Sequence, residues 1–78
     1  MFQELDTVVL TRDLRKHGLK RGDVGAVVHC CKDGAAFEVE FVTADGRTIA
    51  VAALPPQDIR PMSGRELLHV RELVRATP

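Results

Sequence analysis

The most regular pattern in this chain is the alternation of apolar and acidic side chains over residues 36–42. Its apolar positions are Phe37, Val39 and Phe41, and its acidic positions are Glu38 and Glu40. A period of two is typical of an antiparallel sheet that has one buried face and one wet face. We therefore predict a fold built on such a sheet, with the three apolar residues in its core and the two glutamates in solvent.

Other short segments have the composition of strands, because they are rich in β-branched residues or bounded by turn residues. These segments are Asp6–Thr11, Val24–Cys31, Thr48–Ala53 and Ile59–Pro61. Gly46 predicts a hairpin loop over residues 43–47, and Gly25 suits a bulge or a close backbone approach. Pro55 and Pro56 must end the fourth strand, since proline removes donors from the ladder, and a short helical turn within residues 54–58 should lead to the last strand.

Five short antiparallel strands with a long first loop describe a mainly β fold. We predict a small five-stranded SH3-like barrel over residues 1–62, within a single domain of 78 residues. An OB-like barrel is the alternative, although it usually needs a longer chain. The strand spacing thus favours the smaller barrel.

Residues 63–78 follow a different pattern. Ser63 and Glu66 match a capping box, in which the glutamate side chain reaches back to the serine amide. The residues that then recur at helical spacing are Leu67, Val70, Leu73 and Val74. We expect one C-terminal amphipathic α-helix from about Gly64 to Arg75. An isolated helix of about three turns is marginal in water, so its stripe should form a lid on the barrel or a contact with a partner or a second copy.

Positive charge is concentrated in the predicted loop between the first two strands. That loop contains one acid, Asp13, and the cations Arg12, Arg15, Lys16, Lys20 and Arg21. The whole chain has eleven basic and eleven acidic residues, a balance that disfavours a dedicated nucleic-acid binder. A local positive patch can still steer an acidic protein or a phosphate backbone toward one side of the molecule. A long solvated loop with no partner is the simplest alternative.

Cysteine and histidine are the candidate ligands and nucleophiles. Cys30 and Cys31 are adjacent, and with His17, His29 and His69 they form no recognisable zinc spacing. We expect one cysteine to face the core and the other to lie on the opposite strand face, with exposed histidines, no metal and no cofactor. A small cysteine-dependent enzyme that uses His17 or His69 is a disfavoured alternative, because a barrel this small fills its interior with side chains.

The chain has no run of the ~18 consecutive apolar residues that a membrane-spanning helix needs. Its first residues also lack the basic and apolar regions of a signal peptide. Two adjacent cysteines cannot build a disulfide framework of the kind that stabilises small secreted proteins. We therefore expect a cytoplasmic protein.

Three segments together resemble a family of short bacterial proteins of unknown function. They are Leu5–Val28, which contains Gly18-Leu19-Lys20-Arg21-Gly22-Asp23-Val24-Gly25, then Phe37–Gly46, and finally Asp58–Pro61. The resemblance covers roughly residues 4 to 61 and implies an SH3-like barrel. Similar proteins tend to be encoded beside toxin-like or other small partner proteins, which implies an accessory or antidote role. Residues 18–28 also resemble the KOW motif, which implies an RNA-binding alternative.

The predicted function is a non-catalytic protein-binding or accessory module. The residues that we expect to bind the partner are Arg12, Arg15, Lys16, Lys20, Arg21, Leu67, Val70, Leu73 and Val74. The alternatives are a KOW-like RNA-binding barrel and the small cysteine-dependent enzyme.

Overall fold

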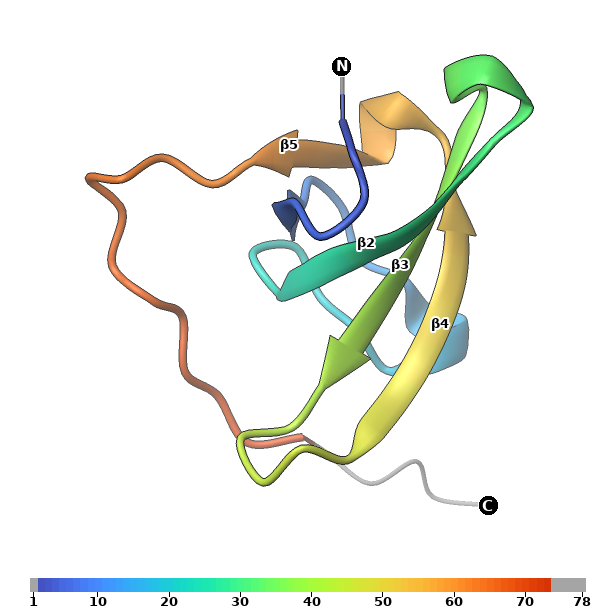
Figure 1. Cartoon of the computed structure of the whole chain (residues 1–78). Coiled ribbons are helices and arrows are strands. Elements are labelled where there is room, and N and C mark those ends of the chain that lie inside the picture. The colour runs from blue at the N-terminus through green and yellow to red at the C-terminus, as the bar shows by residue number, and fades with distance from the viewer. Residues whose placement is uncertain (1, 74–78) are drawn as a thin grey trace.

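The fold is a single five-stranded antiparallel sheet, in a computed structural model that describes residues 2–73. Its strands are β1 (Thr7–Leu10), β2 (Val24–Cys31), β3 (Ala36–Val42), β4 (Thr48–Leu54) and β5 (Ile59–Pro61). They are arranged in the order β4-β3-β2-β1-β5, so the last strand returns to pair with the first (Figure 1). The mainly β character and the five antiparallel strands agree with the prediction from sequence.

Short turns connect the strands. The 3-10 turns are η1 (Arg15–His17), η2 (Lys32–Gly34) and η3 (Pro56–Asp58), and η3 is the turn predicted after the prolines. Between β3 and β4 the Thr43 amide donates to the Arg47 carbonyl at 2.9 Å, and Gly46 has a φ of 87°. A glycine is suited to that left-handed position, so the predicted hairpin loop is confirmed.

The core contains the three apolar residues that alternate along β3. Phe37, Val39 and Phe41 are at most 3% exposed, which confirms the prediction. Phe2 packs edge-on against Phe37, with ring centroids 5.3 Å apart. The outer face of β3 is less open than expected, since both of its glutamates are half-buried. Glu40 accepts a hydrogen bond of 2.6 Å from the Thr48 hydroxyl.

The loop between β1 and β2 contributes to the core, so the expectation of a simply solvated connection is wrong. Leu14 and Leu19 are 8% and 4% exposed and pack in the same cluster as the strand residues. Their backbones pair across the loop, with N–O distances of 2.8 and 3.1 Å. Gly18 makes this possible because it takes a left-handed φ of 69° at the end of η1. The loop therefore holds two leucines inside the molecule.

A register shift interrupts the alternation of β2. It lies between Val27 and His29 in the pairing with β3, and both Val28 and His29 are exposed beside it. After this bulge, Cys30 packs against the core, as predicted for one of the two cysteines. Cys31 is also half-buried, and both cysteines are free thiols.

The predicted C-terminal helix is wrong. Residues 62–73, the described part of the tail, contain a turn at Gly64 and Arg65 and otherwise no regular structure. Leu67 and Val70 are 93% and 90% exposed, and Val74 lies outside the described residues. Between residues 2 and 73 there is no α-helix, and no helical segment long and apolar enough to cross a membrane.

The close approach of β2 to β3 at Gly25 gives a test of the fold. A Cβ at this buried position would lie 2.7 Å from Val39 Cγ1, 2.8 Å from Phe41 Cε1 and 2.9 Å from the Glu40 carbonyl. Because those atoms belong to a packed core, Gly25→Ala should lower the free energy of unfolding by about 1–3 kcal/mol in urea denaturation. Gly64→Ala places its Cβ in open space and should change that free energy by less than about 0.5 kcal/mol. Equal midpoints for the two variants would contradict this packing.

Candidate functional site

The carboxylate of Asp23 is buried and contacts several polar groups from two separate segments of the chain. Asp23 is 8% exposed, and it lies where the loop after β1 leads into β2. Its Oδ1 accepts a hydrogen bond from Arg71 Nε at 2.8 Å and lies 3.1 Å from His69 Nε2. Its Oδ2 accepts from Arg71 Nη2 at 2.5 Å and from the Lys20 amide at 2.8 Å. Two residues of the tail thus meet on one buried acid.

The backbone fixes Asp23 before the tail reaches it. Its amide donates to the Lys20 carbonyl at 2.9 Å, and its carbonyl accepts from the Leu10 amide at 2.9 Å. Gly22 also donates to the Leu10 carbonyl and takes a φ of 93°, which a side chain would strain. The carboxylate then turns back to the Lys20 amide, as aspartate commonly does in turns. The acid is therefore held in place by β1 and by its own loop.

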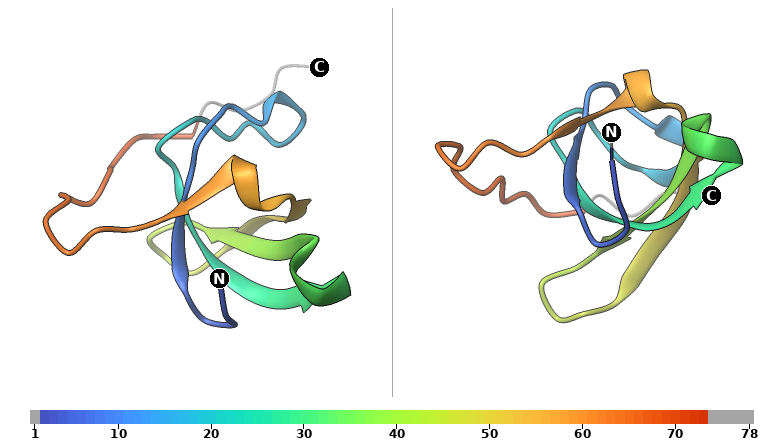
Figure 2. Two further views of the ribbon diagram at one scale, coloured as in Figure 1. Left: turned by 90° about the horizontal axis from the view of Figure 1, so that it is seen from above. Right: turned by 45° about the horizontal axis from the view of Figure 1, so that its top comes forward.

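Residues 63–73 form a segment that we call the strap. It follows β5, stands away from the sheet as a wide loop, and returns to the loop between β1 and β2 (Figures 1 and 2). At its far end Arg71 binds Asp23 as a planar fork and also donates to the Gly18 carbonyl at 3.0 Å. At its near end Glu66 accepts hydrogen bonds of 2.9 and 2.7 Å from Arg60. Charged contacts therefore fasten both ends of the strap.

The capping box that the sequence predicts is present, although no helix follows it in the described residues. Glu66 Oε1 accepts from the Ser63 amide at 2.6 Å, and the Ser63 hydroxyl accepts from the Arg65 amide at 3.2 Å. The Glu66 amide donates to the Ser63 carbonyl at 3.1 Å and so closes one turn. The capping box thus predicts the turn at residues 63–66 correctly, whereas the prediction of a helix over the residues after it is wrong.

Tertiary contacts explain why no helix follows the turn at residues 63–66 within the described chain. A helix advances about 1.5 Å per residue and an extended chain about 3.3 Å, so only an extended strap covers a long path with few residues. The strap has to run from β5 to the loop that contains Gly18 and Asp23. A short helix gains little stability by itself, because its first turn is costly to form. The contacts to Asp23 therefore decide the conformation.

Both acids that fasten the strap are ionised at neutral pH. Burial by itself raises the pKa of Asp23, but hydrogen bonds from Arg71 and the Lys20 amide, with the charges of Arg71 and His69, outweigh it and lower that pKa. Hydrogen bonds from Arg60, and then from the Ser63 amide, lower the pKa of Glu66 to about 2. The strap is therefore held by ion pairs throughout the physiological pH range.

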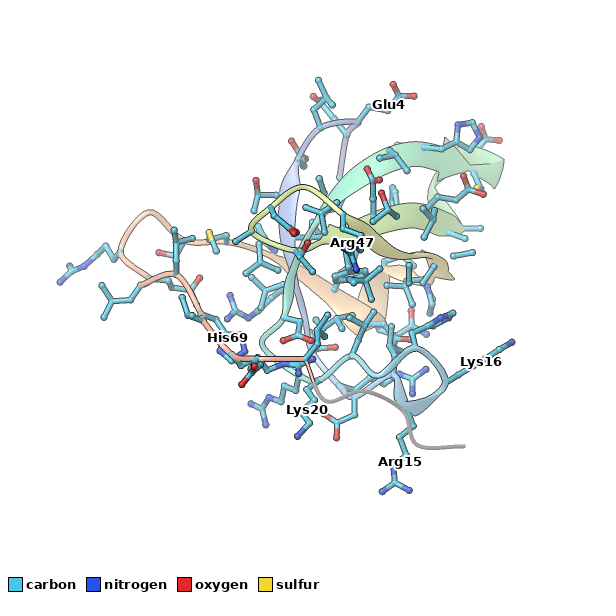
Figure 3. All side chains as sticks on the ribbon, turned by 90° about the horizontal axis from the view of Figure 1, so that it is seen from below. Glu4, Arg15, Lys16, Lys20, Arg47 and His69 are labelled. Carbon is cyan, nitrogen blue, oxygen red and sulfur yellow. The ribbon has the colours of Figure 1, made fainter. Side chains whose placement is uncertain are left out.

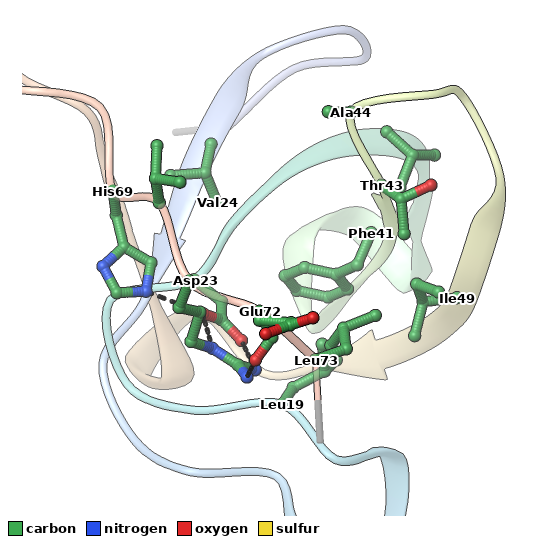
Figure 4. Close-up of a pocket in the computed structure, with 13 residues that line it drawn as sticks. Leu19, Asp23, Val24, Phe41, Thr43, Ala44, Ile49, His69, Glu72 and Leu73 are labelled. Atoms are coloured by element: carbon green, nitrogen blue, oxygen red, sulfur yellow. Dashed lines mark hydrogen bonds and ion pairs between the residues drawn. The ribbon is translucent and has the colours of Figure 1, made fainter. Parts of the chain in front are cut away.

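A cavity of about 620 Å³ lies between the strap and the sheet (Figure 4). The side opposite the strap is mostly apolar and includes Leu19 of the loop after β1, with Phe41 and Ile49 of the sheet. Its strap side runs from His69 to Leu73, and Leu73 is 38% exposed. The stripe that a helix would have kept together is therefore divided, with Leu73 toward the cavity and Leu67 in solvent.

The basic residues of the loop after β1 differ in their surroundings. Arg12 Nε lies 2.9 Å from Oδ2 of Asp58, which is 7% exposed, so this cation is part of the fold. The other four cations are exposed: Arg15, Lys16, Lys20 and Arg21. Figure 3 shows Lys20 and His69 on the same side of the molecule, with the side chains of Arg15 and Lys16 pointing away from it. The contact of Arg71 with Gly18 brings this loop and the strap together.

The cysteine–histidine pair of the disfavoured enzyme alternative is not found at the cavity. Neither Cys30 nor Cys31 is among the described residues that line the cavity beside His69. His17 lies in η1 and His29 on β2, and both are exposed. Within residues 2–73 no cluster of three or more His, Cys, Asp or Glu side chains could hold a metal ion.

Sequence reasoning missed Asp23 and Arg71 as parts of one site. Asp23 directly follows Gly22 and lies two residues before Gly25, which is the usual context of an exposed turn. Arg71 falls within the segment that the sequence predicts as a helix, where a basic residue near the C-terminal end suits the helix dipole. The two residues are 48 positions apart, and no short-range spacing connects them. The sequence signal that could have indicated this contact is a basic residue, Arg71, within a stripe that is otherwise apolar.

The chain belongs to a family without an assigned function. Residues 4–61 match the family described as Domain of unknown function (DUF4926), which confirms that the resemblance over these residues is to a family of unknown function. No curated protein and no solved structure matches the chain. The strap lies outside the matched range, so the family match covers Asp23 but none of the strap residues.

The lowered pKa of Asp23 gives a test of the site. Without the hydrogen bond and the charge of Arg71, the effect of burial is opposed less, so Arg71→Gln should raise the pKa of Asp23 above its value in the parent. An acid whose pKa falls on folding contributes stability at high pH, and this contribution is lost as the pH drops through the folded pKa. The variant should therefore lose the contribution of Asp23 to the free energy of unfolding at a higher pH than the parent does. Carboxyl carbon NMR would follow the titration, with Arg65→Gln as the control. An unchanged Asp23 titration in Arg71→Gln would disprove the contact.

Proposed function

We propose that this member of the DUF4926 family is a non-catalytic protein-binding module that acts as an accessory to a partner protein. The observation that supports this most directly is the exposure of Leu67 and Val70 on the strap, at 93% and 90%. Apolar side chains grouped on a surface often mark interaction sites. These two stand on a segment whose two ends contact the rest of the molecule through Glu66 and Arg71, so they are presented at one place on its surface.

Charge beside the strap supports a protein partner with an acidic surface. Lys20 and Arg21 are exposed on the loop that Arg71 contacts through Gly18, and Arg15 and Lys16 are exposed in the same loop. Opposite charge around an apolar contact accelerates association and selects the partner. We therefore place the proposed binding surface on the strap and on these four cations, and leave Arg12 out because Asp58 holds it.

The finer parts of the proposal come from the resemblance described above. It implies a bacterial protein that serves as antidote to, or stabiliser of, a small protein encoded nearby, and the cytoplasmic location stays the separate expectation from the sequence. The SH3-like barrel also stays a prediction from that resemblance, and the strand order β4-β3-β2-β1-β5 is compatible with it. RNA binding through the basic loop is the competing function, although the chain has neither Trp nor Tyr to stack on bases.

A capture experiment tests the proposal. The full chain, immobilised and exposed to a lysate of its own source cells, should retain a protein whether or not the lysate has been treated with nucleases. The double variant Leu67→Ser/Val70→Ser should reduce that retention about tenfold or more, because burying each such side chain is worth roughly 1.5–3 kcal/mol. Quantitative mass spectrometry would measure the amount retained.

The matched control is Leu5→Asn, which alters another apolar side chain that is 84% exposed but lies far from the strap in sequence. Asparagine suits the left-handed φ of 73° at that position, so the fold should be kept. Arg15→Glu/Lys16→Glu should weaken retention, most at low salt. If nuclease treatment abolishes retention, the proposed function is excluded. It is also excluded if Leu67→Ser/Val70→Ser and Leu5→Asn retain equal amounts of the partner.

A further inference from the structure

The strap combines a strong local signal for helix with an extended conformation. Its capping box is formed, with Glu66 Oε1 2.6 Å from the Ser63 amide, and its residues are mostly good helix formers. Beyond that first turn the chain has no regular structure and reaches Asp23 through His69 and Arg71. Natural sequences usually agree with their structure at each level, and exceptions concentrate at functional segments. This conflict is confined to the strap.

The same residues would regroup if the helix continued from the capping box. Leu67, Val70 and Leu73 would lie along one side of it at spacings of three residues, whereas Leu68 would fall away from that stripe. In the extended strap this grouping is lost, because Leu67 and Val70 are almost fully exposed and Leu73 lines the cavity. The helical form therefore offers a continuous apolar surface that the extended form lacks.

We propose that the strap is a two-state recognition segment, extended and fastened to Asp23 in the free protein, and helical when Leu67, Val70 and Leu73 lie in an apolar, acid-rimmed groove of a partner protein. This inference rests on the proposed function and adds the form in which the partner is recognised. Amphipathic helices that enter apolar grooves are a common mode of peptide recognition. The partner supplies the apolar cover that a short free helix lacks.

Charge favours a different protein over a second copy of this chain as the occupant. The strap lies beside the loop that carries the exposed cations Arg15, Lys16, Lys20 and Arg21. Two copies that met through their straps would bring two such loops toward each other, and like charges across an interface are unfavourable. An acidic rim on the partner's groove would instead attract the loop, together with Arg71 once it leaves Asp23.

The contacts to Asp23 set the population of the competent form. A partner that binds only the released strap has its apparent affinity reduced by the fraction of strap that is free. Removing Arg71 and His69 from Asp23 should raise that fraction without altering the stripe. The fastening therefore works as a restraint on binding that two side chains control.

The first experiment measures the conformation in the full chain by NMR. Cα chemical shifts of residues 64–73 are followed as trifluoroethanol, a helix-favouring co-solvent, is added within the range in which the strands persist. The variant Arg71→Gln/His69→Gln should become helical at a lower concentration of the alcohol than the parent. If the two need the same concentration, or if the residues stay extended in the variant, the inference is wrong.

Leu68 provides a matched pair of variants at one position off the stripe. Its amide donates no hydrogen bond within the described residues, so the extended strap should accept proline there. Leu68→Ser should behave as the parent in trifluoroethanol, whereas Leu68→Pro should block the helix, because proline inside a helix removes a hydrogen bond and clashes with the preceding turn. A helical Leu68→Pro strap would contradict the assignment.

The second experiment repeats the capture with these variants. Retention of the partner should rise severalfold in Arg71→Gln/His69→Gln, stay within about twofold in Leu68→Ser, and fall about tenfold or more in Leu68→Pro. If Leu68→Ser falls as far as Leu68→Pro, the strap is recognised in extended form and this inference fails while the proposed function stands. If Leu67→Ser/Val70→Ser retains as much partner as the parent, or no protein is retained at all, both fail.

Discussion

A buried carboxylate constrains how the outer parts of this molecule are placed. Removing the partners of a buried charge leaves an uncompensated ion, which costs several kcal/mol. Asp23, at 8% exposure, has to be covered by cations and amide donors wherever they come from. The Lys20 amide comes from its own loop, and Arg71 and His69 come from the strap. The loop and the strap are therefore positioned by the same acid.

The strands could be predicted because their signals are local. A period of two along β3, glycine in the hairpin at Gly46, and prolines after β4 each act over a few residues. Gly25 could be recognised as a close approach for the same reason, although the atoms that it approaches could not be named. Leu14 and Leu19 were missed as core residues because they lie among charged neighbours and follow no period.

The helix was predicted wrongly for a reason that local patterns cannot reveal. The Ser63–Glu66 capping box forms, so the propensity was judged correctly as far as it extends. The deciding contact joins Arg71 to an acid 48 residues earlier. Propensity contributes tenths of a kcal/mol per residue, whereas a hydrogen bond to a charged group contributes about 1.5–3 kcal/mol. Among the candidate site residues, the loop cations were found by composition, and Asp23 was not.

The order of the sheet leaves the outer edge of β4 without a strand partner among the described residues. The seven residues of this edge contain no charge and no proline, the two features by which natural sheets most often discourage pairing with a neighbour. The chain also has a formal net charge of zero near neutral pH, so copies do not repel one another at long range. In concentrated solution, we therefore expect copies of the protein to associate by pairing strands at this edge. A buffer whose pH is away from the isoelectric point near 6.8 should keep the protein in solution for longer.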